Sequence, residues 1–317
     1  MNKIAILTRD CAGVNACIRS IVRTCYEKNI KAVGIKKGYD GLIDGNFLSL
    51  NRRDVSGIIN LGGTILKTAR SKRFLQKEYQ QKAIDNLHKN GINGLIVVGG
   101  NGSLTGAHVI ASDYDFPVIG VPATIDNDIS GVDMSLGADT AVNVALDALD
   151  KIRDTATSLE RIFIVEVMGR DCGYIALQVA LAGGCEEVLI PERKINYERM
   201  CKEIKTGNKM GKVSWIIIVA EGAAKAADIS KYIKNETGLE TRVVVLGHIQ
   251  RGGRPIANDR IMGANFGNYA VELLNKNISD KCIYYNDDEL GYLPLKEAIE
   301  PKTIDTERYY KLIKILT

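Results

Sequence analysis

The sequence predicts an α/β protein in which largely parallel β-sheet is covered by helices on both faces. Short runs rich in Val and Ile recur along the chain, and segments of helical periodicity separate them. Such apolar runs are typical of strands that are buried on both faces of a parallel sheet. The glycines, 31 in 317 residues, lie mostly just after these runs. In a parallel sheet, ligands bind at that end of the strands.

The predicted strands follow one another along the whole chain. They are expected at residues 4–7, 32–35, 94–98, 118–121, 162–167, 188–190, 214–220 and 243–246. The clearest helix is expected at residues 141–152, where Val142 and Leu149 share an apolar stripe and Asp147 lies opposite. The length predicts about two domains. No Pro-rich or Ser-rich linker divides the chain, so a second domain would be entered through short crossings.

The composition excludes several classes of protein. Lys plus Arg number 42 and Asp plus Glu 38, so the net charge of +4 is too small to predict a nucleic-acid partner. No apolar run reaches the length of about 18 residues that indicates a membrane helix. The seven cysteines form no CxxC pair, and their odd number favours reduced thiols. We therefore expect a cytoplasmic protein with no nucleic-acid or membrane partner.

A glycine-rich turn follows the strand expected at residues 94–98. It reads GGNGS over residues 99–103 and leads into a helical pattern from Leu104. Glycines at such a place expose backbone N–H groups to an anion, with the positive end of the helix dipole behind them. The turn is neither a P-loop nor a G-x-G-x-x-G fingerprint. A phosphate-binding loop and an ordinary glycine turn both fit it.

A second polar loop, PATIDND, follows the strand expected at residues 118–121. It contains Thr124, Asp126 and Asp128 at a place where the apolar pattern requires no carboxylate. Two carboxylates and a hydroxyl in one loop can supply a general base, a metal ligand and an orienting hydrogen bond. An Asx-rich turn is the alternative interpretation.

Arginines flank the strands that are predicted in the second half of the chain. They are Arg161, Arg170, Arg242 and Arg251. A guanidinium has little structural use beside a buried strand, but its planar fork matches the oxygens of a phosphate. Any one of these residues fits a surface ion pair, whereas together they predict a phosphate-bearing ligand. Phosphoryl transfer suits such a chain because it requires positioning and charge neutralisation more than a nucleophile.

Six strings along the chain resemble the bacterial ATP-dependent 6-phosphofructokinase family. In order they read GGTILKTAR, VVGGNGS, PATIDND, VEVMGRDCG, LAGGCEEVLIPE and LGHIQRGGRP. The resemblance covers essentially the whole chain and implies two Rossmann-like three-layer domains, with the chain crossing between them more than once. The nucleotide-binding domain would comprise residues 1–137 and 250–300. The fructose 6-phosphate-binding domain would comprise residues 138–249 and 301–317.

The resemblance also implies transfer of a phosphoryl group from Mg-ATP to the 1-hydroxyl of fructose 6-phosphate, as in glycolysis. Asp126 would be the general base, and Thr124 and Asp128 would shape the site. Arg170 and Arg70 would stabilise the developing charge. The sugar phosphate would contact Thr124, Asp126, Met168, Gly169, Arg170, Glu221, His248 and Arg251. Arg161 and Arg242 would reach it from a neighbouring subunit, so a homotetramer or a hetero-oligomer with a catalytic paralogue is implied.

The remaining implied sites bind the nucleotide, the metal and an effector. The nucleotide would be bound by Arg9, Asp10, Arg70, Ser71, Gly100, Asn101, Gly102 and Ser103. Mg²⁺ would be held by Asn101 and Asp128. A phosphorylated effector such as ADP or phosphoenolpyruvate would bind at Arg19, Arg23, Arg52, Arg153, Glu186 and Lys212. A solvated basic helix face is the alternative for Arg19 and Arg23, which are four residues apart.

The nucleotide side departs from the family pattern, whereas the sugar-phosphate side keeps it. The family's first loop reads T-x-G-G-D-x-x-G-x-N, but TRDCAGVN at residues 8–15 lacks both glycines and carries Arg9. Asn101 stands where the family has the aspartate that holds magnesium, and an amide oxygen lacks the charge that offsets dehydration of Mg²⁺.

These departures leave several functions open. The chain is expected to be a 6-phosphofructokinase, weak alone, or a catalytically impaired paralogue that acts as a regulatory or fructose 6-phosphate-binding subunit. A pyrophosphate-dependent enzyme or another sugar phosphate is a further alternative. ATP is the expected donor, because Gly102 and Ala123 stand where pyrophosphate users carry Asp and Lys.

Overall fold

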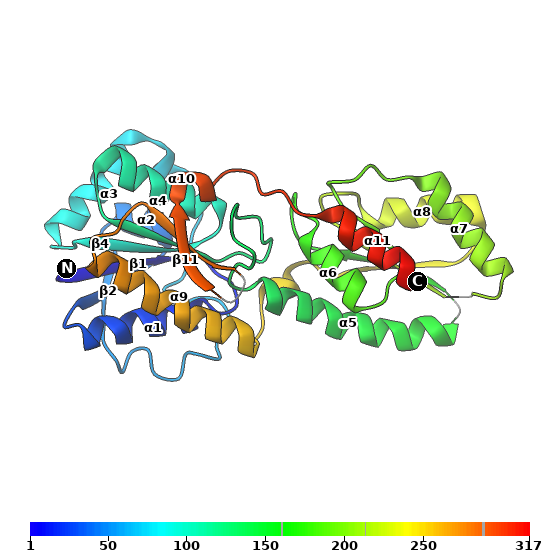
Figure 1. The fold of residues 1–317 in the computed structure, drawn as a ribbon, viewed down its shortest axis with the longest axis horizontal. Helices are drawn as coiled ribbons and strands as arrows, with labels where there is room; N and C mark the ends of the chain where they lie inside the picture. Colours follow the sequence, from blue (N-terminus) through cyan, green and yellow to red (C-terminus); the bar gives the residue numbers. More distant parts are fainter. Residues whose placement is uncertain (160, 213, 287–288) are drawn as a thin grey trace. The chain divides into compact units, whose positions relative to one another are not determined.

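The computed structural model describes residues 1–159, 161–212, 214–286 and 289–317. The chain forms two compact units (Figure 1). Unit 1 comprises Met1–Thr140 and Arg251–Lys302, and unit 2 comprises Ala141–Gln250 and Thr303–Thr317. Each unit is a mostly parallel sheet with helices packed on both faces. The predicted α/β fold class is therefore confirmed.

The sheet of unit 1 is described as seven strands in the order β11-β10-β5-β4-β1-β2-β3. The bounds are β1 Lys3–Thr8, β2 Lys31–Ile35, β3 Phe47–Leu50, β4 Gly94–Gly99, β5 Val118–Pro122, β10 Lys281–Asn286 and β11 Glu289–Pro294. Strands β1, β2, β4, β5 and β10 run parallel, whereas β3 and β11 pair antiparallel with β2 and β10. The sequence did not predict β3, β10 and β11. Two of them, β3 and β11, are partly exposed edge strands and lack a continuous apolar run.

Helices cover both faces of this sheet (Figure 1). On one face α1 (Val14–Glu27) and α9 (Ala257–Asn275) pack against each other. On the other lie α2 (Gly38–Ile43), α3 (Lys77–Lys89), α4 (Asn101–Tyr114) and α10 (Leu295–Ala298). A core that includes Leu7, Val97 and Leu104 fills the space between the strands and this second layer. The three-layer arrangement leaves the loops at the strand ends as the places where polar side chains can gather.

The sheet of unit 2 has the described order β7-β8-β6-β9, and its strands pair parallel. The bounds are β6 Ile162–Val167, β7 Glu187–Leu189, β8 Trp215–Ala220 and β9 Thr241–Val245. Helices α7 (Tyr197–Lys209) and α8 (Ala226–Thr237) share one core with the sheet. Helices α6 (Tyr174–Ala182) and α11 (Thr306–Leu316) pack together and against β7. The helix expected at residues 141–152 lies within α5 (Ala138–Leu159), with Ala145 and Leu149 fully buried.

Strand order marks one place in each sheet where a ligand crevice is expected. In unit 1, β1 lies between β4 and β2, so the loops after β1 and β4 flank the position where the order reverses. In unit 2, β6 lies between β8 and β9, and the loops after these strands flank the corresponding position of that sheet. Several candidate residues lie in these loops, and Thr124, Asp126 and Asp128 lie in the neighbouring loop after β5.

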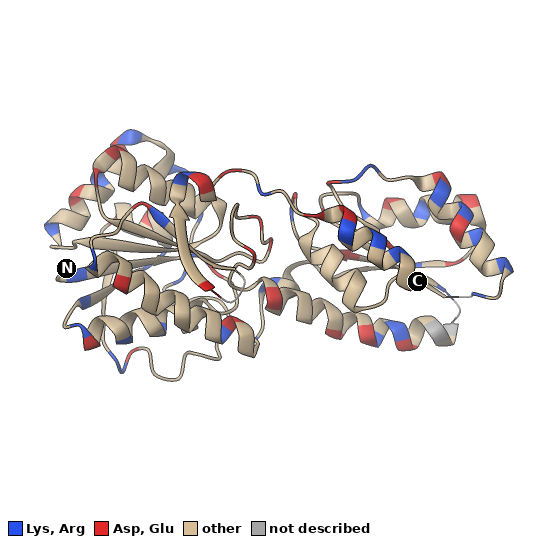
Figure 2. Cartoon of the chain, viewed as in Figure 1, with Lys and Arg blue, Asp and Glu red and all other residues tan. Residues whose placement is uncertain are grey.

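Charge is mixed along the helices of unit 2. Basic residues are interspersed with Glu along α7, whereas α11 has one acidic residue, Glu307, at its start and basic residues after it (Figure 2). Among the described residues, no helix is long and apolar enough to cross a membrane.

Candidate active site

The loop after β1 carries Arg9, whose backbone and guanidinium group are both held by hydrogen bonds. Its backbone N–H donates to Val98 O at 2.9 Å, which ties the loop to the end of β4. Its Nη1 donates to Thr68 Oγ1 at 3.0 Å and to Ala69 O at 2.8 Å. The guanidinium therefore lies beside the segment that leads into Arg70. Asp10 is exposed.

The glycine-rich turn begins α4 at Asn101, three residues earlier than the helical pattern indicated. Gly100 is the N-cap residue, and a Cβ there would lie 3.1 Å from Thr124 Cβ, so this turn contacts the loop after β5. A Cβ at Gly102 would meet open space, which keeps the first turn of α4 accessible. Ser103 is buried, and its N–H donates to Gly100 O at 2.8 Å. The structure thus brings together two loops that the sequence presents separately.

Asn101 and Asp128 join those two loops directly. Asn101 Nδ2 donates to Asp128 Oδ2 at 2.8 Å and to Asp128 O at 3.1 Å. The other side-chain oxygens, Asn101 Oδ1 and Asp128 Oδ1, are buried and have no hydrogen-bond partner among the described residues. Unpartnered oxygens on two side chains that contact each other, one oxygen anionic, suit a divalent cation that also keeps ligands from elsewhere. The residues therefore fit a Mg²⁺ ion that arrives with a phosphate ligand.

Asp126 is only 4% exposed, between Thr124 and Asp128 in the same loop. Its backbone N–H donates to Thr124 Oγ1 at 3.2 Å, which orients the threonine hydroxyl. A buried carboxylate at a loop tip suits a general base because water competes less for its proton-accepting oxygen.

Arg70, expected at the transferring group, and Ser71, expected at the nucleotide, differ in their surroundings. Arg70 is exposed. Ser71 Oγ donates to Asp40 Oδ1 at 2.6 Å and accepts from Phe74 N, which anchors the segment to α2. The geometry therefore gives Ser71 a structural contact and leaves Arg70 extended from an anchored loop.

The loops of unit 2 that follow β6 and β8 interlock. Met168 is buried, and its N–H donates to Gln250 Oε1 at 2.8 Å. Arg170 adopts a left-handed backbone conformation with φ 53°, and its N–H donates to Glu221 Oε1 at 3.0 Å. Gly222 permits this contact because a Cβ there would clash with Arg170 O. Strained backbone held by neighbouring groups is common at ligand sites.

Other residues expected at the sugar phosphate lie at nearby positions of the same unit or at its border. Gly169 has φ 138°, a conformation that L side chains rarely adopt. His248 is exposed in the short 3-10 helix Gly247–Arg251. Arg251 begins the second segment of unit 1.

Arg161 and Arg242 converge on one carboxylate, Glu240. Arg161 Nε lies 2.7 Å from Glu240 Oε2, and Arg242 Nη2 lies 3.4 Å from the same oxygen. Ile162 of β6 pairs with Thr241 of β9, which places the two arginines side by side. Arg242 lies within β9 rather than beside it. No pattern in the sequence indicated Glu240, because only the strand register brings it beside both arginines.

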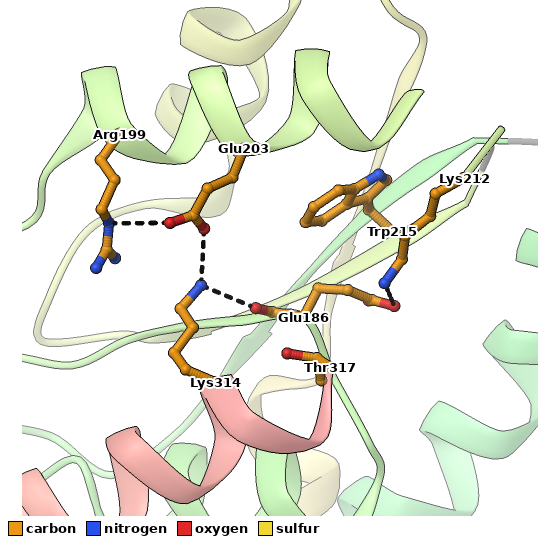
Figure 3. A pocket seen from close by; sticks show the side chains of 7 residues that line it. All are labelled: Glu186, Arg199, Glu203, Lys212, Trp215, Lys314 and Thr317. Atoms are coloured by element: carbon orange, nitrogen blue, oxygen red, sulfur yellow. Dashed lines mark hydrogen bonds and ion pairs between the residues drawn. The ribbon is translucent and has the colours of Figure 1, made fainter. Parts of the chain in front are cut away.

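A cavity of about 400 Å³ in unit 2 contains two of the residues expected at an effector site (Figure 3). It is lined by Glu186, Arg199, Glu203, Lys212, Trp215, Lys314 and Thr317. Glu186 and Lys212 form an ion pair at 3.0 Å. Nearby, Arg153 Nη2 donates to Gly183 O and Gly184 O.

The remaining expected effector residues belong to unit 1. Arg19 and Arg23 lie on α1, and Arg52 lies over the ring of Tyr26 at 5.0 Å. These three residues belong to unit 1, whereas the cavity belongs to unit 2.

Three charged residues of that cavity, Arg199, Glu203 and Lys314, were not predicted from the sequence. Lys314 Nζ donates to Glu203 Oε2 and Glu187 Oε2, each at 2.9 Å. Burial lowers the pKa of Lys314, but attraction to Glu187 and hydrogen bonds to Glu187 and Glu203 outweigh it and raise the pKa. No local pattern indicates this cluster, because only the fold brings α11 beside α7 and β7.

The fold and its loops define a class of protein. Unit 1 places a glycine-rich helix start beside paired carboxylates, and unit 2 presents basic residues in loops at the strand ends. This is the arrangement of a two-unit α/β protein that handles phosphorylated ligands.

The chain belongs to the phosphofructokinase family, whose model matches residues 3–274. It is 48% identical to an ATP-dependent 6-phosphofructokinase of Clostridium tetani over 100% of both chains. It is 51% identical to one of Natranaerobius thermophilus over 94% of each chain. The predicted family is therefore confirmed.

Solved structures share the fold. Phosphofructokinase from Saccharomyces cerevisiae matches with a TM-score of 0.87 at 33% identity, covering 94% of this chain and 45% of that chain. The chain thus spans less than half the length of the yeast chain. A pyrophosphate-dependent phosphofructokinase from Marinobacter aquaeolei matches with a TM-score of 0.83 at 21% identity, covering 99% and 92%. At that identity the likeness concerns the fold alone.

Proposed function

We propose that the chain is an ATP-dependent 6-phosphofructokinase. It transfers a phosphoryl group from ATP to the 1-hydroxyl of fructose 6-phosphate, and the product is the fructose 1,6-bisphosphate of glycolysis. The observation that carries this conclusion is the full-length identity of 48% to a relative of that name. Because the relatives are named as enzymes, catalysis is favoured over a silent regulatory subunit.

Asp126 accepts the proton of the sugar hydroxyl in the proposed reaction. Thr124 and Asp128 shape the loop around it, and Arg70 and Arg170 stabilise the charge that develops on the transferring group. Support comes from the burial of Asp126 and from the contact between Asn101 and Asp128. Phosphoryl transfer depends mainly on such positioning and electrostatic stabilisation.

Mg²⁺ is the proposed cofactor, held by Asn101 Oδ1 and Asp128 Oδ1 together with the nucleotide phosphates. When bound, the ion neutralises the charge of the phosphates. The protein supplies one carboxylate and one neutral oxygen, and no cluster of three His, Cys, Asp or Glu side chains suited to a metal occurs in the described parts of the chain. The nucleotide therefore supplies much of the affinity for the ion.

Unit 1 is proposed to bind the nucleotide, and unit 2 the sugar phosphate. In unit 1, Arg9 and the start of α4 provide positive charge for phosphates. The unit 1 contacts are proposed at Arg9, Asp10, Arg70, Ser71, Gly100, Asn101, Gly102 and Ser103. In unit 2 the contacts are proposed at Met168, Gly169, Arg170, Glu221 and His248. Arg251 completes this set from the adjoining segment.

The active form is proposed to be an oligomer, a tetramer, in which Arg161 and Arg242 complete the sugar-phosphate site of a neighbour. Support comes from β9, an edge strand of the described sheet on which Val243 and Val245 are exposed. An apolar edge strand is a ready surface for another chain. Cytoplasmic location follows as a proposal from the glycolytic role.

A phosphorylated effector is proposed to bind at the residues named for it. Glu186, Lys212 and Arg153 of unit 2, and Arg19, Arg23 and Arg52 of unit 1, would contribute. The cavity that contains Glu186 and Lys212 supports this proposal (Figure 3).

A coupled assay with fructose 6-phosphate tests the function. Wild-type protein receives either Mg-ATP or magnesium pyrophosphate as donor, and fructose 1,6-bisphosphate is measured. We expect product with Mg-ATP and little with pyrophosphate. Absence of product with Mg-ATP from both wild type and Asn101→Asp would contradict the proposal, because the variant restores a second carboxylate.

A further inference from the structure

The loop that carries the proposed base contains an asparagine in an unfavourable backbone conformation. Asn127 lies between Asp126 and Asp128, has φ 51° and is 1% exposed. Left-handed backbone costs roughly 1 to 2 kcal/mol for a residue with a Cβ, although Asn tolerates it better than most. The surroundings must therefore hold this residue in place.

The side chain of Asn127 supplies that restraint through Asp133 and Ser135. Its Oδ1 accepts from Ser135 N at 2.8 Å, and its Nδ2 donates to Asp133 O at 2.8 Å. Ser135 Oγ lies 2.7 Å from Thr124 O and 3.0 Å from Asn127 Oδ1. A serine hydroxyl has one proton, so it donates to one of these oxygens at a time. The segment 133–135 thus contacts the loop at its beginning and near its end.

The segment that holds Asn127 is itself anchored. Leu136 N donates to Pro122 O at 3.0 Å, which extends the pairing of β5. Gly137 N donates to Asp259 Oδ1 at 2.7 Å, and Thr140 N donates to Asp259 Oδ2 at 2.9 Å. Asp259 has no solvent exposure. The contacts run without a gap from α9 through this segment to the loop after β5.

Asn101 contacts the residue that follows Asn127 in the loop, Asp128. Asn101 Nδ2 reaches both Asp128 Oδ2 and Asp128 O, whereas Asn127 is bonded to Asp133 and Ser135. The carboxylate of Asp126 is therefore carried by a short loop whose neighbouring residues are fixed from two directions. A general base must lie within hydrogen-bond reach of the proton that it accepts. A displacement of about 1 Å can lower the rate about 100-fold.

We propose that Asn127, together with Ser135, is a positioning residue that sets the place of the Asp126 carboxylate for proton abstraction. This inference rests on the proposed function, in which Asp126 is the base. The role predicts a loss in kcat with little change in fructose 6-phosphate binding, because the sugar phosphate is held mainly by other residues.

Asn127→Gly is the sharpest test, because glycine adopts φ 51° freely, so the substitution removes the side-chain hydrogen bonds without straining the backbone. The expected result is a kcat at least about tenfold below wild type, with the KM for fructose 6-phosphate and its calorimetric Kd within about threefold. Ser135→Ala removes the hydroxyl but keeps the backbone N–H that donates to Asn127 Oδ1. We therefore expect a smaller fall in kcat than in Asn127→Gly.

Asn29→Gly is the matched control. Asn29 is also left-handed, with φ 57°, but it is exposed and follows α1. This control is expected to keep wild-type kcat and KM. A wild-type kcat in Asn127→Gly would overturn the inference. A fall in kcat accompanied by weaker binding of fructose 6-phosphate and a lower melting temperature would also overturn it, because that pattern indicates a purely structural role. Absence of turnover in the wild type would instead refute the proposed function.

Discussion

At the residue scale, Asn101 is the most informative position of the candidate site. Asn101→Asp removes the Nδ2 hydrogen bond to Asp128 Oδ2 and places two carboxylates side by side. Without metal we expect the variant to lose about 1 to 3 kcal/mol of stability, because Asp128 loses its donor and gains a like charge. With Mg-ADP we expect a larger rise in melting temperature than wild type shows, since a second carboxylate strengthens the cation site.

Melting temperatures in chelator, in ADP and in Mg-ADP check this prediction. Asn268→Asp is the control, because it adds the same charge on the exposed face of α9. If Mg²⁺ raised the melting temperature equally in wild type and Asn101→Asp, the prediction that residue 101 contributes to the cation site would be contradicted.

The sequence predicted some residues of the site but not the ones that hold them. Thr124, Asp126 and Asp128 stand out because a polar loop ends an apolar strand. Ser135 and Glu240 do not stand out, since a buried serine and a surface glutamate occur everywhere. Their significance depends on which loop lies beside them, and that depends on tertiary structure.

At the element scale, α11 is joined to β7 and α7 by a partly buried charge cluster. Lys314 contacts Glu187, whose side chain is only 3% exposed. We expect Lys314→Met to lower the free energy of unfolding by about 1 to 3 kcal/mol at neutral pH, because Glu187 loses a charged donor. Lys311→Met is the control, since Lys311 lies on an exposed part of the same helix.

The loss of stability caused by Lys314→Met should depend on pH in a defined direction. The pKa of Lys314 is raised in the folded protein above the usual 10.5. Its contribution to stability is therefore complete below 10.5 and disappears as the pH rises through the folded pKa. Denaturant unfolding of wild type and Lys314→Met should show a difference at neutral pH that narrows at strongly alkaline pH. A constant difference would argue that Lys314 acts through its apolar stem.

The elements that the sequence predicted best are those buried on both faces. Strands β1, β4, β5, β6 and β8 consist mainly of apolar residues and were predicted from them. Strands β3 and β11 lie at sheet edges, where one face meets water and the apolar run breaks. Strand β10 joins β5 only through Lys281 and Cys282, so its pairing depends on a distant part of the chain.

At the scale of the whole molecule, a shared sugar-phosphate site predicts complementation between subunits. Asp126→Asn removes the base from its own site, and the double variant Arg161→Ala/Arg242→Ala removes the two arginines that a neighbour's site receives. Each protein alone should be nearly inactive. Oligomers that contain both chains should regain activity, because some sites then combine an intact base with intact arginines.

Mixing after dissociation and reassembly, followed by the coupled assay, checks this prediction. The control is the same mixture without dissociation. Activity equal to the sum of the separate variants, in oligomers shown to contain both chains, would contradict a shared site.

An effector site predicts coupling over the whole molecule. A phosphorylated effector should shift the affinity for fructose 6-phosphate by roughly 1 to 3 kcal/mol, and the sugar phosphate must shift effector affinity equally. Calorimetric titration of ADP and phosphoenolpyruvate into wild type and Arg19→Ala/Arg23→Ala measures both. If both proteins bound these effectors equally, or if the wild type bound neither, Arg19 and Arg23 would not form an effector site.

Asp126→Asn tests the central proposal, phosphoryl transfer assisted by a buried base, most directly. The measurement is the steady-state kcat with Mg-ATP, combined with calorimetric binding of fructose 6-phosphate. We predict that the affinity stays within about threefold while kcat falls by roughly 10² to 10⁴, the usual contribution of general acid–base catalysis. An unchanged kcat would show that Asp126 is not the base and would contradict the proposed site.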